Sequence, residues 1–201
     1  MNYKKILVVV LVAVTMFFIT RYGVKNIFFP YKYKEYVDKY SEEYNVDPLL
    51  VLAVIRGESN FDPKAESNKG AKGLMQIMDS TGKWIAEEIG IEEFTPDMLF
   101  NEETNIRLGC WYLKNLEGEF GSLDLILAAY NAGSGHVTKW LKDERYSPNG
   151  DVLTYIPFAE TKKYVDKVKT NYNVYKHFYQ WQDIGDKWQV FKETICIVSK
   201  K

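Results

Sequence analysis

The chain has 201 residues, 46% hydrophobic and 26% charged, which suits one compact domain with short additional segments. A formal net charge of −1 lacks the strong basic excess of nucleic-acid-binding domains, so no nucleic acid partner is expected. With two histidines and with Cys110 and Cys196 far apart, neither a metal site nor a dense disulfide framework is expected. No cofactor is expected. We expect two separate buried thiols, with a single disulfide as the alternative.

Residues 1–25 are interpreted as a membrane anchor or a signal segment. Two lysines precede an apolar run over residues 6–19, and extension of this run through Val24 reaches the roughly 20 residues of a spanning helix. No small-x-small cleavage site follows the run, because its last residues are bulky. We therefore predict an uncleaved single-pass anchor in the cell membrane, with the rest of the chain outside the cytoplasm. Secretion after signal cleavage is the alternative.

Residues 26–43 are predicted to be an aromatic linker and a leading helix, which extends over about 33–44. A second helix begins after Asp47, which can cap it, with Pro48 at its first position. This helix is apolar almost all round as far as Glu58, so we expect it to be the buried central helix.

The rest of the chain predicts a mainly α protein with functional loops. Pro63, Gly70 and Gly73 indicate a loop over residues 60–73, and Asp79 is expected to cap the helix that follows. The later helices are predicted over residues 79–89, 102–116, 122–129, 137–141 and 160–175. Residues 177–201 form a C-terminal tail without a predicted structure.

Glu58 is the first candidate for chemistry. It ends an apolar helix, and a carboxyl that loses hydration has a raised pKa because its charged form is disfavoured. Such a group can keep its proton near neutral pH and then donate it as a general acid. A surface glutamate that happens to end a helix is the alternative on this observation alone.

Four motifs around and after Glu58 occur in a fixed order. They are Glu58-Ser59 with Ser67, Gly73-Leu74-Met75-Gln76, Ala129-Tyr130-Asn131-Ala132-Gly133, and Glu160-Thr161 with Tyr164-Val165. This series resembles the family-1, SLT-type lytic transglycosylases, from about Tyr44 to Lys169. The resemblance implies a lysozyme-like SLT domain over residues 44–176, behind the N-terminal anchor.

The first two motifs imply roles on one side of a cleft. Glu58 matches the catalytic glutamate of the family, and Ser67 matches a serine near that carboxyl and the muramic sugar. Gln76 is implied to bind substrate through its amide, and Met75 or Met78 to form apolar walls. Core packing is the alternative for both methionines.

The later motifs imply further cleft residues. Tyr130 is expected near the glutamate, and Asn131 is expected to hold a loop or the sugar. Glu160 and Tyr164 match later cleft positions. A helix-end role for Asn131 and a role for Glu160 at the start of its helix are the alternatives.

Three positions depart from the family pattern. Asp79 and Gly82 stand where the family usually has proline and often has alanine, and little functional loss is expected. Gly57 stands where many relatives have glutamine or a similar side chain, which removes a neighbour of the glutamate and is expected to loosen the helix end.

The resemblance implies a peptidoglycan lytic transglycosylase, a lyase that cleaves the MurNAc-β-1,4-GlcNAc bond of glycan strands and leaves 1,6-anhydro-MurNAc ends. Glu58 would act first as acid and then as base for the sugar's own C6 hydroxyl. The alternatives are a goose-type lysozyme-like hydrolase, which needs a second acid, and a weakly active glycan-binding scaffold of a cell-wall complex. A partner in the cell-wall machinery is not identified. Trp181 and Trp188 in the tail could stack on sugar, with packing as the alternative.

Overall fold

The computed structural model describes the backbone of residues 3–198 and the side chains of residues 3–180. Its elements in chain order are α1 (Tyr3–Gly23), the π-helical turn η1 (Val24–Phe28), α2 (Lys34–Tyr44), α3 (Pro48–Glu58), β1 (Ala71–Lys72), β2 (Ile77–Met78), α4 (Asp79–Glu88), the 3₁₀ helix η2 (Pro96–Phe100), α5 (Glu102–Phe120), α6 (Leu123–Ala132), α7 (Ser134–Leu141) and α8 (Ala159–Val198). The chain divides into two compact units, Met1–Lys32 with Gln180–Lys201, and Tyr33–Tyr179.

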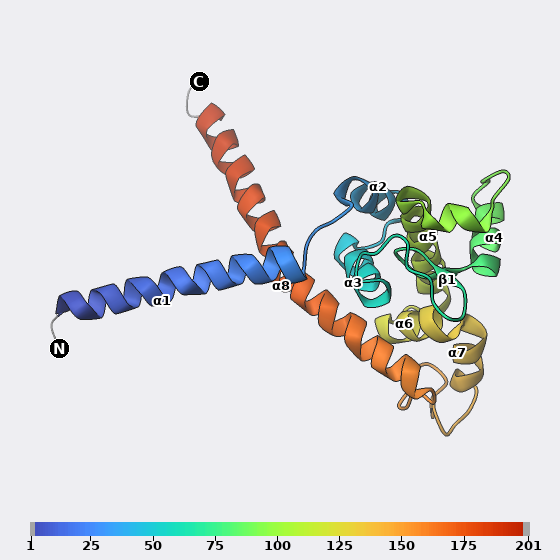
Figure 1. Cartoon of the computed structure of the whole chain (residues 1–201). Coiled ribbons are helices and arrows are strands. Elements are labelled where there is room, and N and C mark those ends of the chain that lie inside the picture. The colour runs from blue at the N-terminus through green and yellow to red at the C-terminus, as the bar shows by residue number, and fades with distance from the viewer. Residues whose placement is uncertain (1–2, 199–201) are drawn as a thin grey trace. The chain divides into compact units, whose positions relative to one another are not determined.

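The N-terminal helix is one continuous element, coloured blue in Figure 1. Helix α1 passes into η1, and together they span 26 residues, Tyr3–Phe28, with a mean hydropathy of 2.2 and none of the apolar window buried. The helix extends well beyond the apolar run of residues 6–19. It is long and apolar enough to cross a membrane, which fits a membrane anchor.

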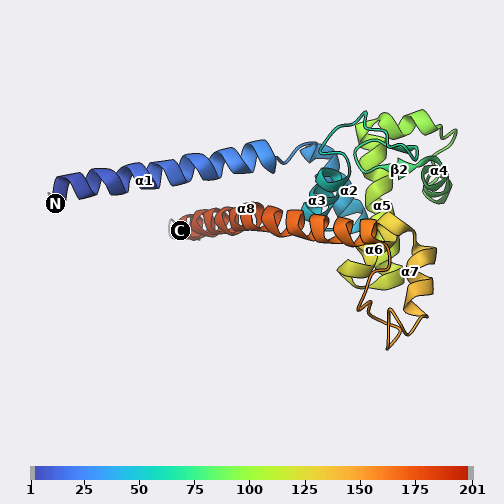
Figure 2. The same cartoon turned by 60° about the horizontal axis from the view of Figure 1, so that its bottom comes forward.

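Helix α3 forms the centre of the second unit, as predicted. Asp47 accepts the backbone N–H of Leu49 at 2.8 Å, and Pro48 occupies the first helical turn, where its missing N–H leaves no bond unmade. The side chains of Val51–Ile55 are completely buried. The first half of α8 lies beside both α3 and α6, as Figures 1 and 2 show from two directions. Close helix packing therefore surrounds the helix that ends at Glu58.

Helices α5 and α8 extend furthest past their predicted ends. Helix α5 ends at Phe120 instead of about residue 116, and Gly121 follows it with a φ of 70°. Helix α8 continues to Val198, past the predicted end near residue 175 and through most of the tail. The side chains of Trp181, Trp188 and Cys196 lie outside the described residues, so the predictions for them are not addressed.

The start of α4 corrects one prediction. Met78, and not Asp79, occupies the capping position, and its side chain makes no capping hydrogen bond. Asp79 lies in the first turn, where its carboxylate accepts hydrogen bonds from the Lys72 ammonium at 2.8 and 3.0 Å. Ala71–Lys72 pairs with Ile77–Met78 as a short antiparallel hairpin that was not predicted, since two-residue strands have no readable periodicity.

Cys110 is a free, buried thiol on α5. Burial raises the pKa of this thiol to about 12, and the nearby Ser41 hydroxyl only partly opposes that effect. The prediction of a separate buried thiol is thus confirmed for Cys110.

Candidate active site

Glu58 is the last residue of α3 and lies mostly buried at the end of that helix. Loss of hydration raises the pKa of its carboxyl to about 7, while the Tyr164 hydroxyl and the positive charge of Lys167 act in the opposite direction. This carboxyl is therefore poised to hold a proton and to release it near neutral pH.

The end of α3 is fixed from two sides. The Ser59 hydroxyl lies 2.8 Å from the carbonyl oxygen of Leu74, to which it donates, and its backbone N–H donates to Ile55 at 3.0 Å. On the other side Gly57 lies so close to α8 that a Cβ there would come within 2.9 Å of Val168. The sequence led us to expect that Gly57 loosens the helix end. In the structure, Gly57 instead allows α8 to pack tightly against the end of α3.

A cavity of about 310 Å³ opens beside Glu58. Seven of the nine residues predicted to form the site line this cavity. The residues that line it are Glu58, Ser67, Asn68, Lys69, Ala71, Gln76, Met78, Tyr130, Asn131 and Glu160. The folded chain thus brings the four motifs of the sequence around one carboxyl.

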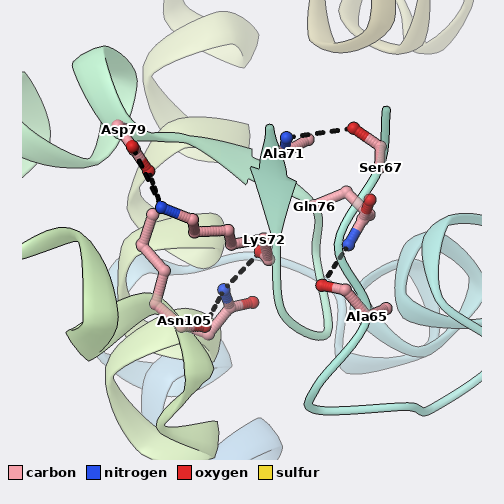
Figure 3. Close-up of polar contacts among 8 residues, drawn as sticks. Ala65, Ser67, Ala71, Lys72, Gln76, Asp79 and Asn105 are labelled. Atoms are coloured by element: carbon pink, nitrogen blue, oxygen red, sulfur yellow. Dashed lines mark hydrogen bonds and ion pairs between the residues drawn. The ribbon is translucent and has the colours of Figure 1, made fainter. Parts of the chain in front are cut away.

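The loop before and within the hairpin forms one wall of this cavity (Figure 3). The Ser67 hydroxyl oxygen accepts the backbone N–H groups of Ala71 at 3.0 Å and Lys69 at 3.3 Å. Gln76 has a φ of 49°, an uncommon backbone state for a residue other than glycine. Its amide nitrogen donates to the carbonyl oxygens of Gly73 at 2.9 Å and Ala65 at 3.1 Å. Both amide protons are thereby used, so Gln76 can offer only its amide oxygen to a ligand.

A buried asparagine supports this wall from behind. The Asn105 side-chain oxygen accepts the backbone N–H of Met75 at 2.7 Å, and its amide nitrogen donates to the carbonyl oxygen of Leu99 at 2.8 Å. The same nitrogen donates to the carbonyl oxygen of Lys72 at 3.0 Å (Figure 3). The side chain is completely buried on α5. The sequence prediction missed Asn105, and its only signal is a polar residue beside the inward Ile106 of an amphipathic helix.

Tyr130 and Asn131, at the end of α6, form a second wall. The Tyr130 hydroxyl donates to the carbonyl oxygen of Met75 at 2.9 Å, so its own lone pairs remain available. Burial and the neighbouring Glu58 raise the pKa of Tyr130 well above its usual value. The Asn131 side-chain oxygen accepts the Thr161 hydroxyl at 2.8 Å, which leaves the amide N–H groups of Asn131 for the cavity.

Two predicted site residues do not line the cavity. The Met75 side chain is completely buried against α5, where a Cβ on Gly109 would meet its sulfur at 2.1 Å. Met75 is thus a core residue, while Met78 is 40% exposed and lines the cleft. Tyr164 is 8% exposed, and its hydroxyl has no aligned hydrogen-bond partner among the described residues. Its interaction with Glu58 nevertheless lowers the pKa of that carboxyl.

Glu160 is the second carboxylate on the cavity wall. It lies in the first turn of α8, and its side chain is 75% exposed and pairs with the Lys69 ammonium at 3.4 Å. Asp62 and Glu66, the acidic residues that follow Glu58 most closely in the chain, are not among the lining residues. Across the described residues, no group of three or more His, Cys, Asp or Glu side chains is arranged to hold a metal ion.

A second cavity of about 230 Å³ adjoins the first, with Gln76, Met78, Tyr130 and Asn131 shared between them. Tyr112 also lines it, and the Tyr112 and Tyr130 rings lie 5.3 Å apart. The cleft is therefore longer than the space beside Glu58 alone.

Comparison with known proteins identifies the domain. The family model described as "Transglycosylase SLT domain" matches residues 35–151, more than half of the chain. The matched range ends before Glu160 and Tyr164. The resemblance inferred from the motifs is confirmed.

Among curated proteins, the soluble lytic murein transglycosylase of Salmonella typhimurium is 35% identical over 155 residues, 75% of this chain and 24% of the relative. The membrane-bound lytic murein transglycosylase C of Edwardsiella ictaluri is 34% identical over 170 residues, 73% of this chain and 47% of that protein. The chain thus spans about a quarter to a half of the length of these relatives.

Solved structures agree with the predicted fold. An inactive mutant of lytic transglycosylase Slt from Pseudomonas aeruginosa matches with a TM-score of 0.68 and 35% identity, covering 76% of this chain and 25% of that one. The 70 kDa soluble lytic transglycosylase of Escherichia coli matches with a TM-score of 0.68 and 34% identity, covering 75% and 25%. The mainly α, lysozyme-like SLT fold is confirmed.

Proposed function

Because the chain belongs to the transglycosylase SLT domain family, we propose that it is a peptidoglycan lytic transglycosylase with Glu58 as its general acid. The observation that carries the proposal is a largely buried carboxyl with a pKa of about 7 on the wall of a cleft. The curated relatives are named as murein transglycosylases, and murein is the same polymer.

Glu58 supplies both proton transfers of the reaction. It first protonates the glycosidic oxygen between MurNAc and GlcNAc, so the bond to the anomeric carbon breaks. The resulting carboxylate then takes the proton of the muramic C6 hydroxyl, whose oxygen attacks the anomeric carbon and closes the 1,6-anhydro ring. A pKa near the working pH serves both steps, because neither protonation state is strongly disfavoured.

The other cleft residues bind and orient the glycan. Tyr130 directs its hydroxyl proton to Met75, so the negative end of that dipole can face the developing oxocarbenium charge. Asn131 offers amide N–H groups, and Gln76 offers an amide oxygen, to hydroxyl or acetamido groups of the sugar. Ser67 can donate its hydroxyl proton, while Met78 supplies an apolar contact. Tyr164 acts from the buried side of Glu58.

A single-acid mechanism is favoured over hydrolysis by two carboxylates. Glu160, the other carboxylate on the wall, is exposed and paired with Lys69. A hydrolase requires a second carboxylate that activates water, or one that acts as a nucleophile. The goose-type hydrolase remains the alternative that the product analysis below distinguishes.

We also propose where the enzyme works. The apolar helix Tyr3–Phe28 anchors it in the cell membrane, with the unit Tyr33–Tyr179 on the extracytoplasmic side, in reach of peptidoglycan glycan strands. This unit includes the leading helix α2 and the predicted domain of residues 44–176. A membrane-bound relative supports the anchored arrangement.

The test is Glu58→Gln, which keeps the shape of the side chain and removes the proton. Purified peptidoglycan is digested with each variant, and the released muropeptides are identified by mass spectrometry. We expect anhydro-muramic ends from the wild type and a rate at least about 10²-fold lower from the variant. Glu87→Gln, an exposed carboxylate of α4, is the matched control.

Two outcomes would contradict the proposal. Reducing ends alone would identify a hydrolase, and full activity of Glu58→Gln would remove Glu58 from the role of acid. Binding without any cleavage by the wild type would indicate a glycan-binding scaffold.

A further inference from the structure

Lys167 contacts the catalytic helix at the position next to the acid. It lies on α8, and its ammonium donates a hydrogen bond to the carbonyl oxygen of Gly57, the residue before Glu58. The last carbonyl groups of an α-helix have no partner within the helix, and a cation there also interacts favourably with the helix dipole. Lys167 thus supplies a hydrogen-bond donor to the Gly57 carbonyl group in the last turn of α3.

The close packing of α8 on α3 makes this contact available. A Cβ on Gly57 would come within 2.9 Å of the Val168 side chain, so a larger residue here would force that side chain or one of the helices to shift. The glycine was noted in the sequence as a departure from the family pattern. In the folded chain, it brings the backbone of α3 within reach of the Lys167 ammonium.

The groups that act on Glu58 come from two helices. From α8 these are the Tyr164 hydroxyl and the Lys167 ammonium, and from α6 it is the Tyr130 hydroxyl. Glu160 and Lys69 lie on the wall of the same cavity, but they pair with each other. Lys167 is the cation that acts on the Glu58 carboxyl.

We propose that Lys167 is a positioning residue for Glu58, which fixes the end of α3 and stabilises the carboxylate formed after Glu58 has donated its proton. The proposal rests on the proposed function. Burial disfavours the charged form of Glu58, and that form is the one required as the base in the second half of the reaction. A nearby ammonium offsets part of this cost without entering the cleft.

Three substitutions separate position from charge. Lys167→Met removes both the donor and the charge, Lys167→Gln keeps a donor without the charge, and Lys167→Arg keeps both. Lys163→Met is the matched control, since Lys163 is another exposed lysine of α8. Initial rates of muropeptide release from soluble uncrosslinked glycan strands are measured from pH 5 to pH 9, together with circular dichroism.

For Lys167→Met, we expect kcat at neutral pH to fall on the order of tenfold, a part of the 10²–10⁴ that a general acid supplies, with KM changed little. Removal of the positive charge raises the pKa of Glu58, so the alkaline limb of the rate profile moves to higher pH. Lys167→Gln is expected to show the same movement with a smaller fall in kcat. Lys167→Arg is expected to retain most of the activity and the wild-type profile.

The result that would overturn the proposal is an unchanged alkaline limb in Lys167→Gln, or an equal movement in Lys163→Met. If Lys167→Met does not fold, Lys167→Gln decides the question. Failure of this inference leaves the products of the wild-type enzyme unchanged, whereas failure of the proposed function appears as reducing ends or as no cleavage at all.

Discussion

Two of the walls of the cavity beside Glu58, the helical wall of α3 and α8 and the loop wall before α4, are built in different ways. The wall that carries the acid consists of α3 and α8, whose apolar side chains are buried and whose backbones approach closely at Gly57. The loop wall, residues 65–78, contains a two-residue hairpin and is held by Ser67, Gln76 and Asn105 through side-chain hydrogen bonds to the backbone. Burial thus sets the pKa of Glu58 in the helical wall, while hydrogen bonds fix the polar groups of the loop wall.

The largest effect is expected when the loop wall loses its support. Asn105→Ala removes three hydrogen bonds and leaves the Met75 N–H buried without a partner, which should lower the free energy of unfolding by about 3–4 kcal/mol. Urea denaturation measures this loss. Asn115→Ala, at an exposed position of the same helix, is the control and should change stability little.

Hydrogen exchange would locate the damage caused by Asn105→Ala. Faster exchange within residues 65–78, with protection retained in α3, is the pattern expected from two separately stabilised walls. Equal loosening of both walls would contradict the comparison.

The acid-bearing wall should respond to pH instead. The pKa of Glu58 is about 7 in the folded chain, above the ordinary value of 4.5, so the folded state binds its proton more tightly than the unfolded state. The contribution of Glu58 to the free energy of unfolding therefore decreases as pH rises from about 4.5 through 7, and it is constant above that range. The loss should amount to about 2–3 kcal/mol.

Urea denaturation at pH 5 and pH 8 tests this dependence, with Glu58→Gln as the reference that cannot titrate. Between pH 5 and pH 8, the free energy of unfolding should fall more for the wild type than for Glu58→Gln. A difference that does not change with pH would show that Glu58 is not desolvated.

Ser59 connects the two walls, and its loss should have a smaller effect. Ser59→Ala removes the hydroxyl that donates to Leu74, leaving one carbonyl unpaired, and should cost about 1 kcal/mol of unfolding free energy. Thermal unfolding measures the change, with the exposed Ser80→Ala as control. A loss as large as that of Asn105→Ala would mean that the walls are not stabilised independently.

The smallest effect is expected at the rim of the cleft. Lys69 and Glu160 form an ion pair with side chains 78% and 75% exposed, and such pairs contribute little because water screens them. Lys69→Gln should change the unfolding free energy by less than about 0.5 kcal/mol. A larger loss of unfolding free energy in urea denaturation would show that the Lys69–Glu160 ion pair contributes to stability.

Local sequence patterns predicted the acid-bearing wall well. Asp47, Pro48 and the apolar run after them define α3 without reference to the rest of the chain, because capping and burial act locally. Seven of the nine residues that the motifs indicated line the cavity beside Glu58. Met75 shows the limit, since a methionine next to a motif glutamine can face the core as easily as the cleft.

The contacts that join distant segments were not predictable from one sequence. Asn105 meets the hairpin from α5, and Lys167 meets Gly57 across 110 positions of the chain. Neither residue has a local pattern that differs from an ordinary polar helix position. The cap predicted at Asp79 was also wrong, since Asp79 lies within the first turn of α4 and its carboxylate accepts a hydrogen bond from Lys72.

The buried thiol of Cys110 provides an internal probe of unfolding. With a pKa of about 12 and no exposed surface, it stays protonated and out of reach of alkylating reagents in the folded protein. Once Cys196 is replaced by serine, the labelling rate of Cys110 would report how often the core around α5 opens. The same protection would let an unpaired cysteine persist in an oxidising compartment without forming mixed disulfides.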